Sequence, residues 1–240
     1  MEDLIKKIES KGYWKVILRP NIYKANLIPS LPECKKLIQA NNLELRGWDY
    51  PHIDREGIMV ASENSVHSYC DWPEGPMFEY WRFYQTGQFV HYFAMREDLR
   101  ISDLKKKEFQ DEFGNKIEKF LSILSTVYSV TEIYQFASKL FSKLDIEGVE
   151  IIIELHDVNK RMLTFWDNFG RFLSRPYICE FSSGVLTIGK GEIISKENLI
   201  KNSSELAIDS TIKIFNAFNW DSVTKNIFLE DQKKLLERRL

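Results

Sequence analysis

The sequence predicts an α+β fold with mixed or antiparallel sheets, because strand and helix patterns occur in blocks instead of a regular β-α-β alternation. Three observations support this prediction. An alternating strand pattern opens the chain, two aromatic-rich runs predict a β-hairpin at about residues 78–95, and apolar residues at helical spacing predict helices near 30–42, 117–144 and 203–218.

The N-terminal segment begins with a short amphipathic helix at residues 2–10 and continues into a half-buried strand at residues 13–19. The next helix has a clear start signal. Ser30 stands three residues before Glu33, which is the spacing of a capping box. We therefore expect a helix of about three turns over residues 30–42.

The aromatic hairpin is the clearest local signal in the sequence. A two-residue Thr-Gly turn within residues 85–88 is predicted, and its register places Arg82 opposite His91 on one face. Trp81 and Phe83 then lie on the other face and are predicted to face the core. Both faces are rich in apolar side chains, so the hairpin should be covered on both sides.

The second half of the chain contains helix patterns at both ends and strand patterns between them. Apolar spacing over residues 117–144 predicts two consecutive helices or one broken helix, with a second capping box formed by Ser129 and Glu132. Residues 149–155 predict a strand, and residues 203–218 predict an amphipathic helix. Further strand patterns occupy residues 177–181 and 185–194.

Residues 101–116 are strongly charged and carry little periodic apolar signal, which is typical of a connecting segment. The sequence therefore predicts an N-terminal β-rich lobe at residues 1–100 and a C-terminal helix-strand lobe at residues 117–240. A single domain that contains both segments is the alternative.

Charge and cysteine content restrict the partners and the compartment. Lys and Arg number 33 against 35 Asp and Glu, so charge does not favour a nucleic-acid partner, although a local basic patch would still allow one. The sequence has no signal-peptide pattern and no membrane-spanning run, so we expect a cytoplasmic protein without a membrane partner. Three widely spaced cysteines are expected to be free thiols, namely Cys34, Cys70 and Cys179.

Catalytic and cofactor motifs are absent or incomplete. Residues 184–191 match the spacing of a phosphate-binding loop up to its last position, which is Gly191 instead of Ser or Thr. The histidines show no zinc-ligand spacing, since the one close pair, His67 and Cys70, would point to opposite faces of a strand. No GxSxG elbow is present. We therefore predict no cofactor and no metal, and the sequence leans towards a non-catalytic protein.

Two acids offer an alternative function. Glu150 and Glu154 lie on one face of the predicted strand at residues 149–155, with Asp157 just beyond it. Clustered carboxylates of this kind hold divalent metals in hydrolases and nucleases. Alternating acids on the solvent face of a half-buried strand produce the same pattern, which is the structural interpretation.

Two segments concentrate the residue types that bind ligands. Arg46, Trp48 and His52 lie within a turn-rich stretch, and loops carry a large share of binding residues. Arg82 and His91 stand among aromatic residues of the hairpin. We predict that all five lie near one another and bind an anionic or aromatic ligand through guanidinium hydrogen bonds and ring stacking. The structural alternative is that the rings fill the core and that Arg46 pairs with a carboxylate.

The leading functional hypothesis is a non-catalytic binding or accessory module that recognises a protein, a nucleotide-like ligand or a nucleic acid. Its main support is that no convincing catalytic set occurs in the sequence. A metal-dependent hydrolase or nuclease with carboxylates near Glu150 and Glu154 is the second hypothesis. Single-stranded nucleic-acid binding by the aromatic hairpin is the third, and the near-neutral charge weighs against it.

Overall fold

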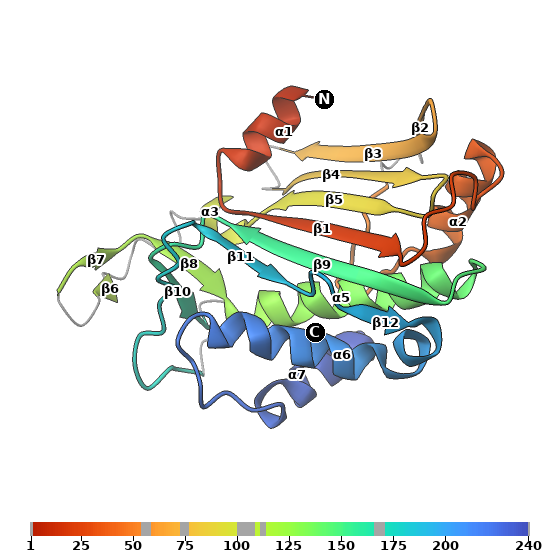
Figure 1. Ribbon diagram of the computed structural model, residues 1–240. Helices are drawn as coiled ribbons and strands as arrows, with labels where there is room; N and C mark the ends of the chain where they lie inside the picture. Colours follow the sequence, from red (N-terminus) through yellow and green to blue (C-terminus); the bar gives the residue numbers. More distant parts are fainter. Residues whose placement is uncertain are drawn as a thin grey trace.

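One large β-sheet with helices packed on its two faces organises the fold (Figure 1). The computed structural model describes residues 2–53, 59–72, 77–99, 109–110, 114–165 and 171–239. The helices are α1 (Glu2–Glu9), α2 (Leu31–Asn41), α3 (Arg96–Leu99), α5 (Ile123–Ser142), α6 (Lys196–Asn216) and α7 (Asn226–Leu236). The strands are β1 (Tyr13–Pro20), β2 (Val60–Ser62), β3 (Ser65–Trp72), β4 (Met77–Tyr84), β5 (Phe89–Ala94), β6 (Phe109–Gln110), β7 (Lys116–Ile117), β8 (Lys119–Ser122), β9 (Gly148–His156), β10 (Arg161–Thr164), β11 (Val185–Ile188) and β12 (Ile193–Ser195). The fold is therefore α+β, as the sequence predicts.

The main sheet has eight strands in the order β11-β9-β1-β5-β4-β3-β2, and β12 also pairs with β9. All of these pairs are antiparallel, whereas β8 and β10 form a separate parallel pair. The pairing of β1 with β9 runs from Tyr13 opposite His156 to Pro20 opposite Val149. Strands from both predicted lobes therefore belong to one sheet. The predicted connection at residues 101–116 lies mostly outside the described residues.

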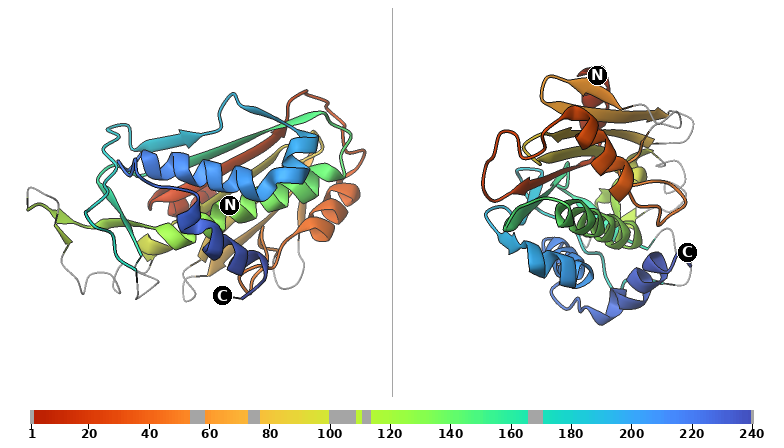
Figure 2. Two further views of the ribbon diagram at one scale, coloured as in Figure 1. Left: turned by 90° about the horizontal axis from the view of Figure 1, so that it is seen from below. Right: turned by 90° about the vertical axis from the view of Figure 1, so that its right-hand side faces the viewer.

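Helices cover the two faces of the sheet unequally. Helix α5 lies along one face, with α6 packed against it and α7 beside both (Figure 2). The main core forms between α5 and the sheet, where the rings of Phe89 and Phe136 lie 5.0 Å apart. Helix α1 covers part of the other face, where Leu4 and Ile8 pack near Tyr80. The hairpin β4–β5 is thus covered on both sides, as expected.

The register of the hairpin differs from the prediction. Trp81 lies opposite His91, and Arg82 lies opposite Val90. The predicted register is wrong by one residue, because the Tyr84 N–H donates to the Gln88 carbonyl and leaves a three-residue loop, 85–87, which ends at Gly87 with a φ of +80°. A left-handed glycine after a tight turn adds one residue to the loop. Because side chains alternate across a strand, Arg82 and His91 lie on opposite faces of the sheet.

The two predicted capping boxes have different outcomes. Ser30 caps α2, and its Oγ accepts a hydrogen bond from the backbone N–H of Glu33 at 3.3 Å. Ser129 and Glu132 lie inside α5, so the second capping box is wrong. Helix α5 is continuous and starts later than expected, after strand β8, with Ser122 as its cap. The spacing of a capping box also occurs in a helix interior, where position i+3 returns to the same side.

Burial and thiol state agree with two further expectations. Trp81 and Phe83 are fully buried, which confirms the face chosen for them. Cys34, Cys70 and Cys179 are all free cysteines. Among the described residues, no helix combines the length and the apolar composition that a membrane span requires.

Trp81→Ala is expected to lower the free energy of unfolding by about 3–5 kcal/mol, because it empties a fully buried ring site. The ring stacks on Phe89, and its Nε1–H donates to the carbonyl of His52 at 2.6 Å. Chemical denaturation measures the loss, with Trp72→Ala as the matched control because Trp72 is 49% exposed. Equal stability of the two variants would contradict the prediction.

Candidate functional site

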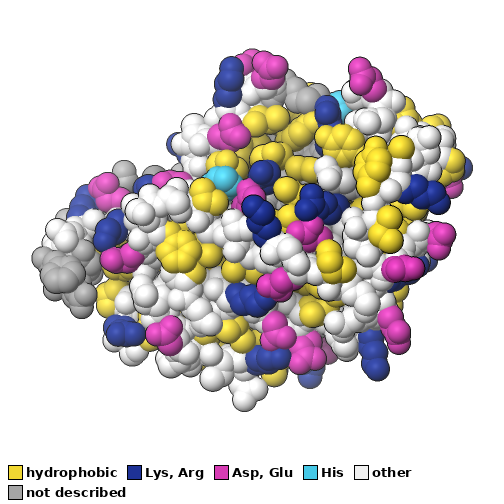
Figure 3. All heavy atoms as spheres, viewed as in Figure 1, with side chains coloured by type: hydrophobic (Ala, Val, Ile, Leu, Met, Phe, Trp, Pro, Cys, Tyr) yellow, Lys and Arg dark blue, Asp and Glu magenta, His cyan; other side chains and the backbone are white. Residues whose placement is uncertain are grey.

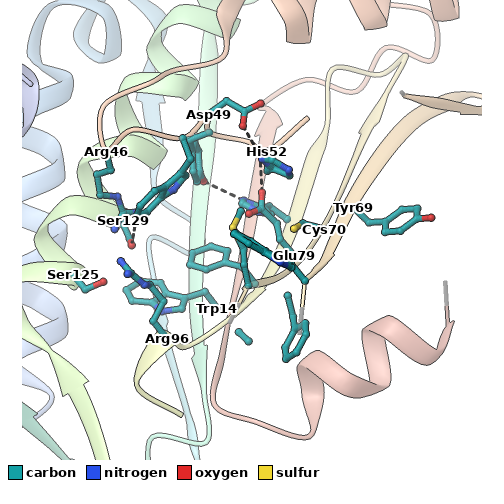
Figure 4. A pocket seen from close by; sticks show the side chains of 18 of the residues that line it. Trp14, Arg46, Asp49, His52, Tyr69, Cys70, Glu79, Arg96, Ser125 and Ser129 are labelled. Atoms are coloured by element: carbon teal, nitrogen blue, oxygen red, sulfur yellow. Dashed lines mark hydrogen bonds and ion pairs between the residues drawn. The ribbon is translucent and has the colours of Figure 1, made fainter. Parts of the chain in front are cut away.

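A cavity of about 1030 Å³ lies between the loop of residues 42–53, the face of β3, β4 and β5, and the first half of α5 (Figure 4). Aromatic side chains form much of its wall, namely Trp14, Trp48, Tyr50, Tyr69, Trp72, Phe78 and Phe93. The charged or titratable side chains that line it are Glu44, Arg46, Asp49, His52, Asp71, Glu79, His91, Arg96 and Glu97. Its volume is that of a typical small-molecule site.

A buried ion pair joins the 42–53 loop to α5. Arg46 Nη2 lies 2.5 Å from Glu132 Oε2, and Arg46 Nε donates to Glu132 Oε1 at 3.1 Å. The same guanidinium also donates to Ser129 Oγ at 3.3 Å. Burial raises the pKa of Glu132, and the Arg46 charge opposes that rise. Arg46 therefore neutralises a carboxylate in the middle of a buried helix and holds the loop against it.

Two guanidinium groups contact Trp48 at the cavity wall. The Arg46 and Arg96 guanidinium carbons lie 5.1 and 5.2 Å from the centroid of the Trp48 ring. Arg96 comes from the first position of α3, so the contact joins three segments of the chain. Cation–π contacts at these distances favour a fixed orientation of the indole.

His52 is held by a network that includes its backbone and its ring. Its Nδ1 lies 2.7 Å from Asp49 Oδ1, and its backbone N–H donates to Glu79 Oε1 at 2.9 Å. The hydrogen bond to Asp49, together with the effect of the neighbouring Cys70 thiol, raises the pKa of His52 to about 10. The ring is therefore an imidazolium at neutral pH.

His91 forms the buried floor of the cavity. Its Nδ1 lies 3.2 Å from the hydroxyl of Tyr50, and its ring meets the Tyr50 ring edge to face. Its Nε2 lies 2.9 Å from Glu79 Oε1. Burial raises the pKa of Tyr50, so its hydroxyl remains protonated. Glu79 thus lies between the His52 backbone and His91.

The structure brings four of the five predicted binding residues together. Arg46, Trp48, His52 and His91 all line the cavity, and that they bind a ligand stays a prediction. Arg82 does not line it, since the corrected register turns its side chain to the opposite face, near Tyr84. The expected juxtaposition of Arg82 with His91 is therefore wrong.

Four further cavity residues were not predicted as binding residues. Asp49, Glu79 and Arg96 were not singled out, and Cys70 was considered only with His67 as a metal pair. Cys70 and Glu79 are directly opposite each other on β3 and β4, so a strand pairing of these runs would have placed them on one face. For Arg96 the sequence contains no such signal.

The acids of the metal-dependent alternative form ion pairs with β1. Arg19 lies opposite Glu150 and Lys15 lies opposite Glu154, with nitrogen–oxygen distances of 2.6 and 3.1 Å. Figure 3 shows acidic and basic side chains side by side over the sheet. Hydrogen bonds and the neighbouring cations lower the pKa of both carboxyls against the effect of burial. Within the described ranges, no group of three His, Cys, Asp or Glu side chains is placed to hold a metal ion.

No protein-family model, curated protein or solved structure matches this chain. Its function therefore has to be inferred from the residues that line the cavity.

Arg46→Ala is expected to lower the free energy of unfolding by about 3–5 kcal/mol, because it leaves Glu132 buried without a cation. The double variant Arg46→Met/Glu132→Leu should recover most of this loss, since it removes both charges. Denaturant titration of the two variants and the wild type tests the pair. A double variant as unstable as Arg46→Ala would show that the cost comes from lost packing instead.

We expect His52 to make a pH-dependent contribution to the free energy of unfolding. Its folded pKa of about 10 lies above the ordinary value of 6.5, so the contribution is complete below pH 6.5 and is lost as pH rises through 10. The stability advantage of the wild type over His52→Gln should therefore shrink across that window. Denaturation at pH 6, 8 and 10 measures it, and a Cys70→Ser background removes the titration of the thiol. An advantage that is constant with pH would contradict the assignment.

Proposed function

We propose that this chain is a binding protein whose cavity takes a nucleotide-like ligand, a molecule with a planar aromatic ring and an anionic group. The observation that carries the proposal is the convergence of stacked rings and guanidinium groups in one cavity of about 1030 Å³. Aromatic walls with a few placed polar groups are the usual composition of small-molecule sites.

Arg96 is a cationic residue of the cavity wall. Several acids line the cavity, but most already have partners within the protein. Asp49 contacts His52, Asp71 pairs with Lys7 at 2.5 Å, and Glu97 accepts the backbone N–H of Ser122 at 2.7 Å. Arg46 is likewise engaged by its own carboxylate partner. We assign the anion of the ligand to the Arg96 guanidinium, which lines the cavity beside Trp48.

The aromatic wall provides surfaces for a planar ring. Trp14 and Phe93 stack on each other with centroids 5.7 Å apart, and Trp48 lies partly exposed near the arginines. Stacking on such rings contributes roughly 1–3 kcal/mol per base in nucleic-acid sites. A concave cavity of this size fits a small molecule better than a folded protein partner, which would contact a broader and flatter surface.

The metal-dependent hydrolase or nuclease is not favoured by any observation in the described residues. Glu150 and Glu154 lie outside the cavity lining, and each contacts a cation of β1. Their arrangement has the features of cross-strand ion pairs on a sheet.

Arg96→Met is expected to weaken binding of an adenine or guanine nucleotide by about tenfold or more, because a hydrogen bond to a charged group contributes roughly 1.5–3 kcal/mol. Trp48→Ala should weaken binding of the nucleotide and also of the uncharged nucleoside. Isothermal titration calorimetry with AMP, ATP, GTP and adenosine measures both effects.

Arg82→Met is the matched control, because it removes a guanidinium from the opposite face of the sheet. The expected result is wild-type affinity for this variant. Equal affinity of wild type and Arg96→Met, or no heat with any of the four compounds at millimolar concentration, would overturn the proposal.

A further inference from the structure

We propose that Glu79 binds the base of the nucleotide and selects guanine over adenine, through the oxygen that its carboxylate presents to the cavity. This inference rests on the proposed nucleotide-binding function and deepens it, because it names the base. It is argued from the contacts of the two Glu79 oxygens, from the burial of the residue and from its place in the cavity wall.

The two oxygens of Glu79 have different surroundings. Two nitrogens already face Oε1, since the backbone N–H of His52 donates to it at 2.9 Å and His91 Nε2 also lies 2.9 Å from it. Oε2 makes no hydrogen bond to any residue in the part of the chain that the structure describes. A carboxylate oxygen can accept two hydrogen bonds, so Oε2 offers two accepting positions to a ligand.

Glu79 is nearly enclosed by protein, although it lines the cavity. The residue is only 7% exposed. An acceptor in such a place is costly when it has no donor, because burial has removed most of its contact with water. A ligand that brings N–H groups to Oε2 recovers this cost, and a ligand that brings another acceptor increases it. The burial of Glu79 therefore makes it a residue that discriminates between ligands.

An aromatic surface lies directly beside this acceptor. Phe93 on β5 is paired opposite Glu79 on β4, and its ring stacks on Trp14 with centroids 5.7 Å apart. Residues opposite each other in a sheet point to the same face, so the Phe93 ring and the Glu79 carboxylate are neighbours in the cavity wall. A base that stacks on this surface has its edge at Glu79.

The acceptor and the cation that we assign to the anion lie on different sides of the cavity. Figure 4 shows Arg96 towards α5, where Ser125 is labelled, and Glu79 towards the strands, next to His52. A nucleotide has a corresponding polarity, because its phosphate and the hydrogen-bonding edge of its base lie at opposite ends. Arg96 and Glu79 are therefore placed to bind the two ends of one molecule.

The Watson–Crick edge of guanine matches two accepting positions. It presents N1–H and one N–H of the 2-amino group side by side. Adenine and cytosine each present an amino group beside a ring nitrogen that accepts, and a carboxylate repels a second acceptor because it has no proton to donate. Hypoxanthine has the N1–H of guanine without the amino group, so it can make only one of the two hydrogen bonds. These bases therefore form a graded series of ligands.

Isothermal titration calorimetry of the wild-type protein with GTP, ITP and ATP tests this assignment. GTP should bind most tightly, ITP about tenfold more weakly and ATP more weakly again, because each lost hydrogen bond to a charged group corresponds to roughly tenfold or more in affinity. The three compounds share the triphosphate, so a contact with Arg96 is common to all of them. Equal affinities would overturn the base assignment and leave the proposed function standing, whereas no heat with any compound would overturn both.

Glu79→Gln changes the hydrogen-bonding character of the group that faces the ligand. The amide oxygen should take the place of Oε1, because the His52 N–H needs an acceptor, and the amide NH2 then replaces Oε2. The ratio of GTP affinity to ATP affinity should therefore fall by about tenfold or more. Glu63→Gln is the matched control, since it makes the same change at an exposed acid between β2 and β3 and should keep the wild-type ratio.

The affinity ratio separates base recognition from a structural role of Glu79. If the carboxylate only holds the backbone of His52, its replacement will change the affinities for GTP and ATP by the same factor. An unchanged ratio in a Glu79→Gln variant that is folded by circular dichroism would overturn the inference. If this variant does not fold, the wild-type series with GTP, ITP and ATP decides the assignment without it.

Discussion

The rest of the structure depends on the burial of α5 between the sheet and α6. Most of its residues are buried, and one of them, Glu132, is a carboxylate with no exposed surface. A buried charge of this kind is tolerated only with a partner of opposite charge. Arg46 is that partner, and it donates two hydrogen bonds to the carboxylate. That partner belongs to the 42–53 loop, so the loop must lie against the helix wherever the helix packs on the sheet. The position of Trp48, which contacts the same arginine, follows from this constraint.

The other side of the loop is held by the hairpin, which makes the hairpin register decisive for the cavity. The Trp81 indole and the Glu79 carboxylate bond to the carbonyl and the N–H of His52. A shift of the register by one residue would leave Trp81 and Glu79 in place on β4. It would, however, place a side chain of the opposite face, instead of His91, beside Trp81. The extra loop residue at Gly87 therefore decides that an imidazole, instead of an apolar or phenolic group, forms the floor of the cavity.

Local features could be predicted from the sequence, whereas features set by long-range packing could not. The Ser30 cap, the hairpin and the buried face of β4 each follow from a few neighbouring residues, and all are present. The loop residues Arg46, Trp48 and His52 were recognisable because they share one turn-rich stretch. The contacts of Glu132 and Glu79 were not, since each depends on a partner distant in sequence. A Ser-x-x-Glu pattern has the same spacing at the start of a helix and in its interior. Only the burial of α5 shows that Ser129 and Glu132 belong to an interior.

The carboxylate of Asp49 serves the loop in two ways. One oxygen closes the loop by accepting the N–H of Ile53, and the other holds the ring of His52. A second acid, Glu79, accepts the backbone N–H of His52, so the loop is bound to β4 as well as closed on itself. Closure of the turn alone requires only a short side-chain acceptor for its N–H, such as Ser or Asn. The additional contacts of Asp49 and Glu79 therefore fix the position of the His52 imidazole at the cavity wall.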